Sequence, residues 1–179
     1  GDSYLELTAG SGGYAAEVIE RIGDEPSATL VDRDKFAIKK LKERFPKARV
    51  IHADFASAID TLKSEGAQFD VVLADLGVSS VQLDVAERGF GFQNEARLDM
   101  RMDEAQELNA WEVVNTYSKG DLAKILKNYG DEPRAERIAD LIKNARPVNT
   151  TKDLEAIIKR VYQGYSKKNP ATRTFQAIR

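Results

Sequence analysis

Short apolar runs alternate with longer amphipathic stretches over residues 1–75. This alternation is typical of βαβ units and predicts an α/β fold built on a parallel sheet. We expect strands at the four apolar runs, which are residues 4–8, 28–31, 49–52 and 69–73. The amphipathic stretches between them predict helices over residues 14–22, 35–45 and about 56–66.

The pattern changes after Asp75. Residues 76–108 show no sustained period and predict a long ordered loop, and such a loop within a compact domain is usually functional. The remainder has helical periodicity, with expected helices at 110–116, 119–130, about 132–145, 150–162 and from Pro170 onward. Because only four strands can be recognised, we interpret the chain as part of a larger α/β domain.

Length and composition narrow the class of protein. The chain has 179 residues, 42% of them hydrophobic, which suits one domain or a domain with a sizeable insertion. No apolar run approaches the roughly 20 residues of a membrane span, and no secretory leader precedes the first strand. There is no cysteine, hence neither a disulfide nor a thiolate nucleophile. We expect a cytoplasmic protein without a membrane partner.

Charge is unevenly distributed along the chain. Residues 1–118 contain 13 Lys and Arg against 22 Asp and Glu, whereas residues 119–179 contain 14 against 7. A basic half is typical of a surface that faces nucleic acid, and tyrosines among the basic residues could stack on bases. The alternative is a set of helices with solvated lysine faces. The basic residues are Lys124, Lys127, Arg134, Arg137, Lys143, Arg146, Lys159, Arg160, Lys167 and Lys168, with Tyr129, Tyr162 and Tyr165 among them.

A glycine-rich turn, Gly10-Ser11-Gly12-Gly13, separates the first expected strand from the first helix. Glycine permits positive φ and close backbone approach there, so that helix-terminal N–H groups can meet a ligand. Asp32 follows Gly10 by 22 residues, at the end of the second strand, where a carboxylate can accept ribose hydroxyls. Turn and acid together favour a ribose-bearing cofactor over an ordinary tight turn with a surface Asp. They do not separate a nicotinamide from S-adenosylmethionine.

Asp75 directly follows the fourth expected strand. Open α/β sheets bind ligands at the carboxyl ends of their strands. A carboxylate there can accept the protons of an exocyclic amine and orient its nitrogen for methyl transfer in a water-poor site. The alternative is an Asp that caps a helix or turn. The same turn also carries Ser79, Ser80 and Gln82.

Other polar and aromatic residues favour structural interpretations. His52 is the only histidine, so neither a usual zinc site nor a Ser-His-Asp hydrolase is expected. Acidic residues of the 99–104 segment fit a solvated loop better than a magnesium site, and we predict no metal. Trp111 and Tyr117 lie on helix faces and are expected in the core.

Six segments carry a resemblance to a known family: residues 6–13, 31–34, 75–84, 87–90, 98–103 and 170–177. The two central ones, Asp75-Leu-Gly-Val-Ser-Ser-Val-Gln-Leu-Asp84 and Leu98-Asp-Met-Arg-Met-Asp103, are too specific to be chance. On these motifs the chain resembles the bacterial small-subunit ribosomal RNA methyltransferase H family, also called MraW, over essentially all of its length.

The resemblance implies a class I methyltransferase with a Rossmann-like sheet. Its activity would be transfer of a methyl group from S-adenosylmethionine to N4 of a cytidine in small-subunit ribosomal RNA. It implies a core at residues 1–105 and 170–179, incomplete in this chain, and an all-helical insertion at 106–169 that recognises RNA. The partner would be this RNA or the assembling small subunit. Because the family extends beyond both Gly1 and Arg179, apolar surface left by missing strands could support a homodimer.

Carried over by position, the resemblance assigns cofactor contacts to Gly12, Gly13, Tyr14, Asp32, Phe55, Asp75 and Gln82. The glycine turn adds Gly10 to this set, and Asp75 is the expected catalytic residue. Candidate substrate contacts are Ser79, Ser80, Arg88 and Arg101. The family usually has His at the position of Tyr14 and Asp at that of Glu6. The absence of cysteine fits N4 methylation, because methylation at cytosine C5 normally needs a thiolate.

Three alternatives remain open. The chain could be a methyltransferase of the same fold that acts on a protein or small molecule. It could instead be an RNA- or ribosome-binding module without turnover. A nicotinamide-dependent dehydrogenase is a more distant alternative, because no obvious acid or base for hydride transfer is present.

Overall fold

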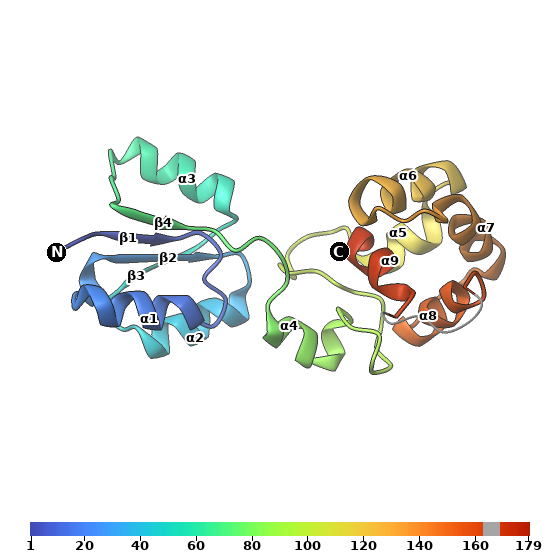
Figure 1. Cartoon of the computed structure of the whole chain (residues 1–179), viewed down its shortest axis with the longest axis horizontal. Coiled ribbons are helices and arrows are strands. Elements are labelled where there is room, and N and C mark those ends of the chain that lie inside the picture. The colour runs from blue at the N-terminus through green and yellow to red at the C-terminus, as the bar shows by residue number, and fades with distance from the viewer. Residues whose placement is uncertain (163–168) are drawn as a thin grey trace. The chain divides into compact units, whose positions relative to one another are not determined.

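The structure is a computed structural model that describes residues 1–162 and 169–179, without the side chains of Ser80 and Val81. The chain forms two compact units, residues 1–79 and 80–179, which are described separately below (Figure 1). Three members of the expected basic and aromatic set, Tyr165, Lys167 and Lys168, lie outside the described residues.

The first unit is built on a four-stranded parallel sheet. Its strands are β1 (Tyr4–Glu6), β2 (Ala28–Asp32), β3 (Arg49–His52) and β4 (Val71–Leu73), in the order β3-β2-β1-β4. Tyr4 pairs with Ala28 on one side and Val71 on the other, and both pairings are parallel. The α/β prediction is therefore confirmed. The direction of strand progression reverses between β1 and β4, and ligands of open parallel sheets bind at such a switch point.

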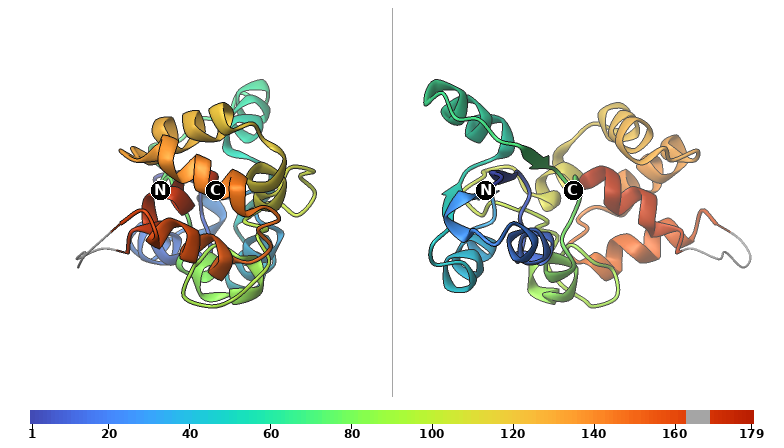
Figure 2. Two further views of the ribbon diagram at one scale, coloured as in Figure 1. Left: turned by 90° about the vertical axis from the view of Figure 1, so that its right-hand side faces the viewer. Right: turned by 60° about the vertical axis from the view of Figure 1, so that its left-hand side comes forward.

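Helices cover both faces of this sheet. Helices α1 (Gly13–Ile22) and α2 (Lys35–Arg44) lie on one face, and α3 (Phe55–Ser64) lies on the other (Figures 1 and 2). The 3₁₀ turn η1 (Glu25–Ser27) leads into β2. Successive β1 side chains point to opposite faces, so Tyr4 joins the core under α1 and α2 while Leu5 joins the core under α3. The helices begin where sequence predicts, because Asp34 and Asp54 cap α2 and α3 by accepting backbone N–H bonds.

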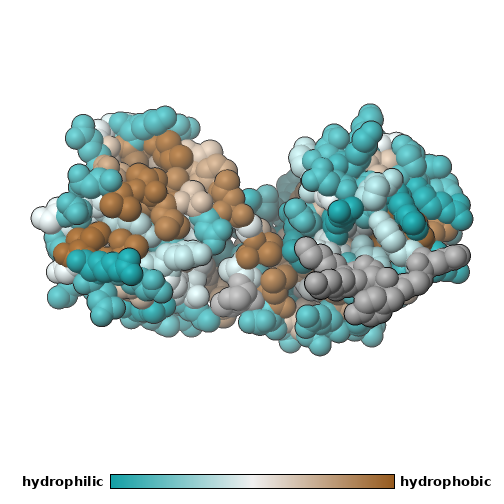
Figure 3. All heavy atoms as spheres, in the orientation of Figure 1, coloured by the Kyte–Doolittle hydropathy of each residue, from teal (hydrophilic) through white to brown (hydrophobic). Residues whose placement is uncertain are grey.

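Strand β4 is an edge of the sheet among the described residues, and its side chains are only partly covered. Val71 is 41% and Val72 58% exposed, in a fold whose parallel strands are normally covered on both faces. Figure 3 shows apolar side chains gathered on this side of the first unit. The unit therefore presents an apolar surface beside the end of β4.

The second unit is helical. It contains α4 (Ser80–Asp84), the 3₁₀ turn η2 (Ala86–Arg88), α5 (Ala110–Thr116), α6 (Lys119–Gly130), α7 (Ala135–Ala145), α8 (Thr151–Lys159) and α9 (Ala171–Ile178). Helices α5 to α9 enclose one hydrophobic core that includes Leu122, Ile138, Leu154 and Phe175. Gly130 permits the close approach of α6 and α9, since a Cβ there would lie 2.4 Å from the carbonyl oxygen of Arg173.

The boundary between the two compact units lies at residues 79 and 80, whereas the helical insertion was expected to start at residue 106. Residues 80–105 and 170–179, expected with the sheet, belong to the helical unit. The physical reason is burial: Leu98, Met100 and Phe175 are all 3% exposed or less within the helical core. Helix α7 also begins at Ala135 rather than near 132, because Arg134, with φ −108° and ψ 25°, is its N-cap. Helix α6 ends before Asp131, which has a positive φ of 46°.

The placement of Trp111 was predicted wrongly. It is 40% exposed, and its indole N–H donates to the side chain of Asn149 over 3.0 Å. Tyr117 is partly buried against the helical core, as expected. The buried face of α5 is formed by Ala110, Val113 and Val114 instead. Trp111 stays partly exposed because its indole N–H needs a polar partner, which Asn149 provides.

Candidate functional site

The glycine-rich turn after β1 has a backbone shape that only glycine adopts readily. Gly10 and Gly12 have φ values of 53° and 79°, and Gly12 is the N-cap of α1. A Cβ on Gly12 would lie 2.4 Å from a ring carbon of Phe45. A Cβ on Gly13, by contrast, would meet nothing within 4 Å, so the backbone at the start of α1 borders open space.

Helix α2 holds this turn from the other side. The guanidinium of Arg44 donates to the carbonyl oxygens of Ser11 and Gly12 over 3.1 and 3.0 Å. Its charge also lies 5.2 Å from the centre of the Phe45 ring. Both carbonyls therefore point toward α2, and the turn has a fixed peptide orientation.

Asp32 joins the end of β2 to the turn that follows β1. One carboxylate oxygen accepts from the N–H of Gly10 over 2.7 Å, and the other accepts from that of Asp34 over 2.8 Å. Burial raises the pKa of Asp32 above its ordinary value, although these backbone amides oppose the shift. Each oxygen retains acceptor capacity, since an ionised carboxylate offers about four lone-pair sites.

The segment after β4 lies beside the same turn. The N–H of Asp75 donates to the hydroxyl of Thr8 over 2.9 Å, and a Cβ on Gly10 would lie 3.8 Å from that of Ser79. The Asp75 residue is exposed. The structure thus brings Gly10, Asp32, Asp75 and Ser79 together at the carboxyl edge of the sheet, as the sequence predicts for parallel strands.

Glu6 was missed as a site residue by the sequence analysis. It is 1% exposed, and one oxygen accepts from the hydroxyl of Tyr4 over 2.8 Å. Its Oε1 atom has no hydrogen-bond partner among the described residues. Burial first, then the nearby charges of Asp32 and Asp75, raise the pKa of Glu6 to about 7. The sequence did contain a signal for this residue, because Glu6 is a carboxylate within an otherwise apolar strand of a predicted parallel sheet.

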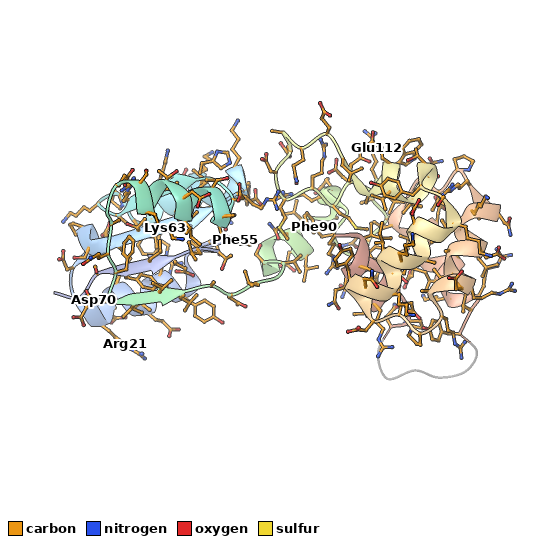
Figure 4. All side chains as sticks on the ribbon, turned by 90° about the horizontal axis from the view of Figure 1, so that it is seen from above. Arg21, Phe55, Lys63, Asp70, Phe90 and Glu112 are labelled. Atoms are coloured by element: carbon orange, nitrogen blue, oxygen red, sulfur yellow. The ribbon has the colours of Figure 1, made fainter. Side chains whose placement is uncertain are left out.

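Two aromatic residues border this edge of the first unit. Tyr14 on α1 is 51% exposed, and Phe55 at the start of α3 is 46% exposed. Figure 4 places Phe55 and Asp70 at opposite ends of this unit. Phe55 follows the cap residue Asp54, so its backbone is fixed while its ring remains available. His52, close by at the end of β3, faces the carbonyl oxygen of Arg33 through Nε2 at 3.1 Å.

The remaining predicted contacts belong to the second unit, so their placement relative to this edge is not described. Gln82 on α4 is buried, and the side chain of Ser80 lies outside the described residues. Arg88 donates to the carbonyl oxygens of Arg101 and Met102, both at 3.0 Å. Arg101 forms a bidentate pair with Asp99, with both N···O distances 2.8 Å. Both arginines organise the 85–105 segment, and contact with a substrate stays a prediction for them.

Residues 1–162 and 169–179 contain neither a membrane-spanning helix nor a metal-binding cluster. None of their helices is long and apolar enough to cross a membrane. They contain no group of three or more His, Cys, Asp or Glu residues placed to hold a metal ion.

Sheet order, the glycine turn and the acids at the strand ends define an α/β protein with the fold of class I methyltransferases. The chain belongs to the MraW methylase family, whose model matches residues 1–179. The family resemblance stated from the sequence motifs is confirmed.

Three curated relatives, all named ribosomal RNA small subunit methyltransferase H, illustrate the similarity. The protein from Mycoplasmopsis agalactiae is 43% identical, that from Clostridioides difficile 41% and that from Picosynechococcus 42%. Each match covers 98% of this chain. The chain spans about 60% of the length of these relatives, which are matched over 61%, 60% and 61% of their own sequences.

Proposed function

We propose that this protein methylates small-subunit ribosomal RNA with S-adenosylmethionine, at the N4 amino group of a cytidine. The observation that carries the proposal is the bond from the Gly10 amide to Asp32, which joins a ribose-binding acid to a glycine turn. Asp75 lies beside that turn, at the switch point of the parallel sheet. Small-subunit ribosomal RNA is proposed as the substrate because the relatives are named ribosomal RNA small subunit methyltransferase H.

The residues at the carboxyl edge fit S-adenosylmethionine. Open backbone at Gly13 admits close approach by a ligand, and Asp32 keeps acceptor capacity for ribose hydroxyls. The buried Oε1 of Glu6, which has no hydrogen-bond partner among the described residues, and the exposed Asp75 suit a cofactor with positive charge. Bound there, the cofactor supplies an electrophilic methyl group. The proposed contacts are Gly10, Gly12, Gly13, Tyr14, Asp32, Phe55, Asp75 and Gln82.

In this proposal Asp75 orients the acceptor. Its carboxylate would accept a hydrogen bond from the N4 amino group, which turns the nitrogen lone pair toward the methyl carbon. As the N–C bond forms and the S–C bond breaks, the cofactor would leave as S-adenosylhomocysteine, and Asp75 would take up the proton that the nitrogen loses. The Thr8 hydroxyl fixes the Asp75 backbone and so restricts where that carboxylate can point. Direct displacement needs no covalent intermediate, and this chain contributes no cysteine thiolate for attack on the cytosine ring.

The helical unit is the proposed RNA-binding part. Lys124 and Arg137 have side chains 77% and 66% exposed. Their ion pairs with Asp121 and Asp140 are long, with N···O distances of 3.6 and 3.7 Å. Surface pairs of this kind are weak and leave the cations able to contact phosphates. Tyr129 on α6 is 69% exposed and offers a ring on which a base can stack. A cytoplasmic location and a homodimer stay predictions.

The test is methyl transfer from labelled S-adenosylmethionine to small-subunit ribosomal RNA, with the modified nucleoside identified by mass spectrometry. The proposal expects N4-methylcytidine. Methylation of a protein or a small molecule instead of RNA would assign another substrate to the same fold. Tight RNA binding with no cofactor binding would favour an RNA-binding module without turnover.

A further inference from the structure

Glu6 stands out among the buried polar groups of the first unit. It lies at the end of β1, directly before the segment that leads into the glycine turn, and is 1% exposed. Tyr4 Oη donates to one of its oxygens, whereas Oε1 has no partner among the described residues. An unpartnered buried oxygen is costly, because burial removes the water that would otherwise bind it.

The groups that face Glu6 are mostly acidic. Asp32 approaches from the end of β2 and Asp75 from the segment after β4, and both raise the pKa of Glu6. From α1, the backbone amide of Ala15 faces the Glu6 carboxyl and lowers its pKa. By hydrogen-bond geometry, Oε1 still has no partner among the described residues. The charged groups among the largest influences on the Glu6 pKa are the carboxyls of Asp32 and Asp75, so the free protein gathers three carboxyl groups here.

The cofactor of the proposed function changes this balance. S-adenosylmethionine has two cationic groups, a sulfonium and an ammonium, and a single carboxylate. A ligand that contacts both Asp32 and Asp75 brings positive charge to the same group of carboxyls. Positive charge at such a site favours ionised carboxylate over neutral acid.

We propose that Glu6 is a proton-linked cofactor-binding residue: it is neutral in the free protein and releases its proton to solvent when the cationic cofactor binds. The inference rests on the proposed function, because it needs a positively charged ligand at the carboxyl edge. It adds that cofactor binding is sensitive to pH near neutrality. Ionised Glu6 then helps to hold the ligand, while the neutral acid avoids repulsion among three carboxylates in the empty site.

The sign of the pH dependence follows from the free protein. Below pH 7 the Glu6 carboxyl is protonated, and binding must expel that proton. Binding therefore weakens as the pH falls. With the pKa of Glu6 at about 7 in the free protein, the dissociation constant should rise roughly tenfold from pH 7.5 to pH 6.

The experiment is calorimetric titration with S-adenosylmethionine at pH 6 and 7.5, in two buffers of different ionisation enthalpy. At pH 6 the wild type should release about one proton per bound cofactor. Glu6→Gln should bind with little proton release and about twofold or less pH dependence. This variant also distinguishes protons released by Glu6 from protons released by the amino group of the ligand, because the ligand contributes equally with both proteins.

Glu132→Gln is the matched control. Glu132 lies in the helical unit, is 2% exposed and also has an oxygen without a partner among the described residues. Neutralising it should leave proton release at the wild-type value. If Glu6→Gln does not fold, carbon-13 NMR of the Glu6 carboxyl in the wild type, titrated with and without cofactor, answers the same question.

Two results would overturn the inference while leaving the proposed function intact. They are pH-independent cofactor binding by the wild type without proton release, and a Glu6→Gln variant that releases as many protons as the wild type. A folded protein that binds no S-adenosylmethionine at any pH would instead contradict the proposed function, and the inference with it.

Discussion

At the scale of single residues, the glycine turn of the site has a backbone conformation and a packing that exclude most side chains. Gly12 combines a positive φ with a ring carbon 2.4 Å from where a Cβ would be. Asp32 is held by two backbone amides before any ligand arrives. The site is thus largely formed by the fold of the first unit, and its chemistry depends on which carboxyl groups stay ionised.

Gly12→Ala should destabilise the protein by about 2 kcal/mol or more, because the methyl group meets Phe45 and the backbone is left-handed. Gly13→Ala is the matched control, since its Cβ meets nothing within 4 Å. Its stability should stay within about 0.5 kcal/mol of wild type. Denaturant unfolding measures both. Equal stability of the two variants would contradict the described turn.

Asp75→Asn should reduce methyl transfer by about 100-fold or more while changing cofactor affinity only a few-fold, because the amide no longer accepts the amino proton with full charge. Asp60→Asn, on the exposed face of α3, is the control and should keep wild-type turnover. Rates are measured with saturating RNA and cofactor. Unchanged turnover in Asp75→Asn would remove this residue from the reaction.

At the scale of elements, the longer helices and the strands were predictable, but the short helix α4 and the 3₁₀ turn η2, both within the loop expected at residues 76–108, were not. Helix α5 spans residues 110–116, as its helical periodicity predicted. In the structure Asn109 and Glu112 form a capping box that fixes its start. Segment 85–105 has no period, since side-chain bonds such as those of Arg88 to backbone carbonyls hold it instead. Long-range bonds of this kind leave no local pattern in the sequence.

The candidate site was predictable only in part for the same reason. Glycine spacing and strand-end acids identified Gly10, Asp32 and Asp75, because parallel strands bring their carboxyl ends to one edge. The roles of Glu6 and Arg44 depend on which neighbours face them across the sheet and from α2. That information comes from packing rather than from a motif.

Helix α2 supports the proposed cofactor site through Arg44. Arg44→Ala should weaken cofactor binding about tenfold, because the carbonyls of Ser11 and Gly12 lose a charged donor that orients the turn. Lys42→Ala, exposed on the same helix, should bind as wild type does. Calorimetric titration of both variants at pH 7.5 decides the matter. Equal affinity of the two would show that the turn holds its shape without Arg44.

At the scale of the whole molecule, we propose that the first unit binds the cofactor and the helical unit binds RNA. The first unit holds the acids of the cofactor site, and the basic half of the sequence falls within the helical unit. Binding of the RNA phosphate backbone by that half should weaken with salt, since each phosphate contact releases counterions.

Removing two exposed cations, by Lys127→Ala with Arg137→Ala, should reduce the slope of log affinity against log salt by about 1.5. Lys63→Ala with Lys42→Ala removes the same charge from the first unit and should leave the slope near wild type. Fluorescence anisotropy with a labelled fragment of small-subunit ribosomal RNA measures both. Equal slopes for the two double variants would show that the helical unit does not hold the RNA backbone.

The central claim is that the carboxyl edge of the sheet holds S-adenosylmethionine. Calorimetric titration of the protein with S-adenosylmethionine, with NAD as the comparison ligand and Asp32→Ala as the variant, tests it most directly. We expect saturable binding of S-adenosylmethionine alone, weakened at least tenfold by loss of the Asp32 carboxylate. Binding of NAD instead, or no binding of either ligand by the folded wild type, would contradict it.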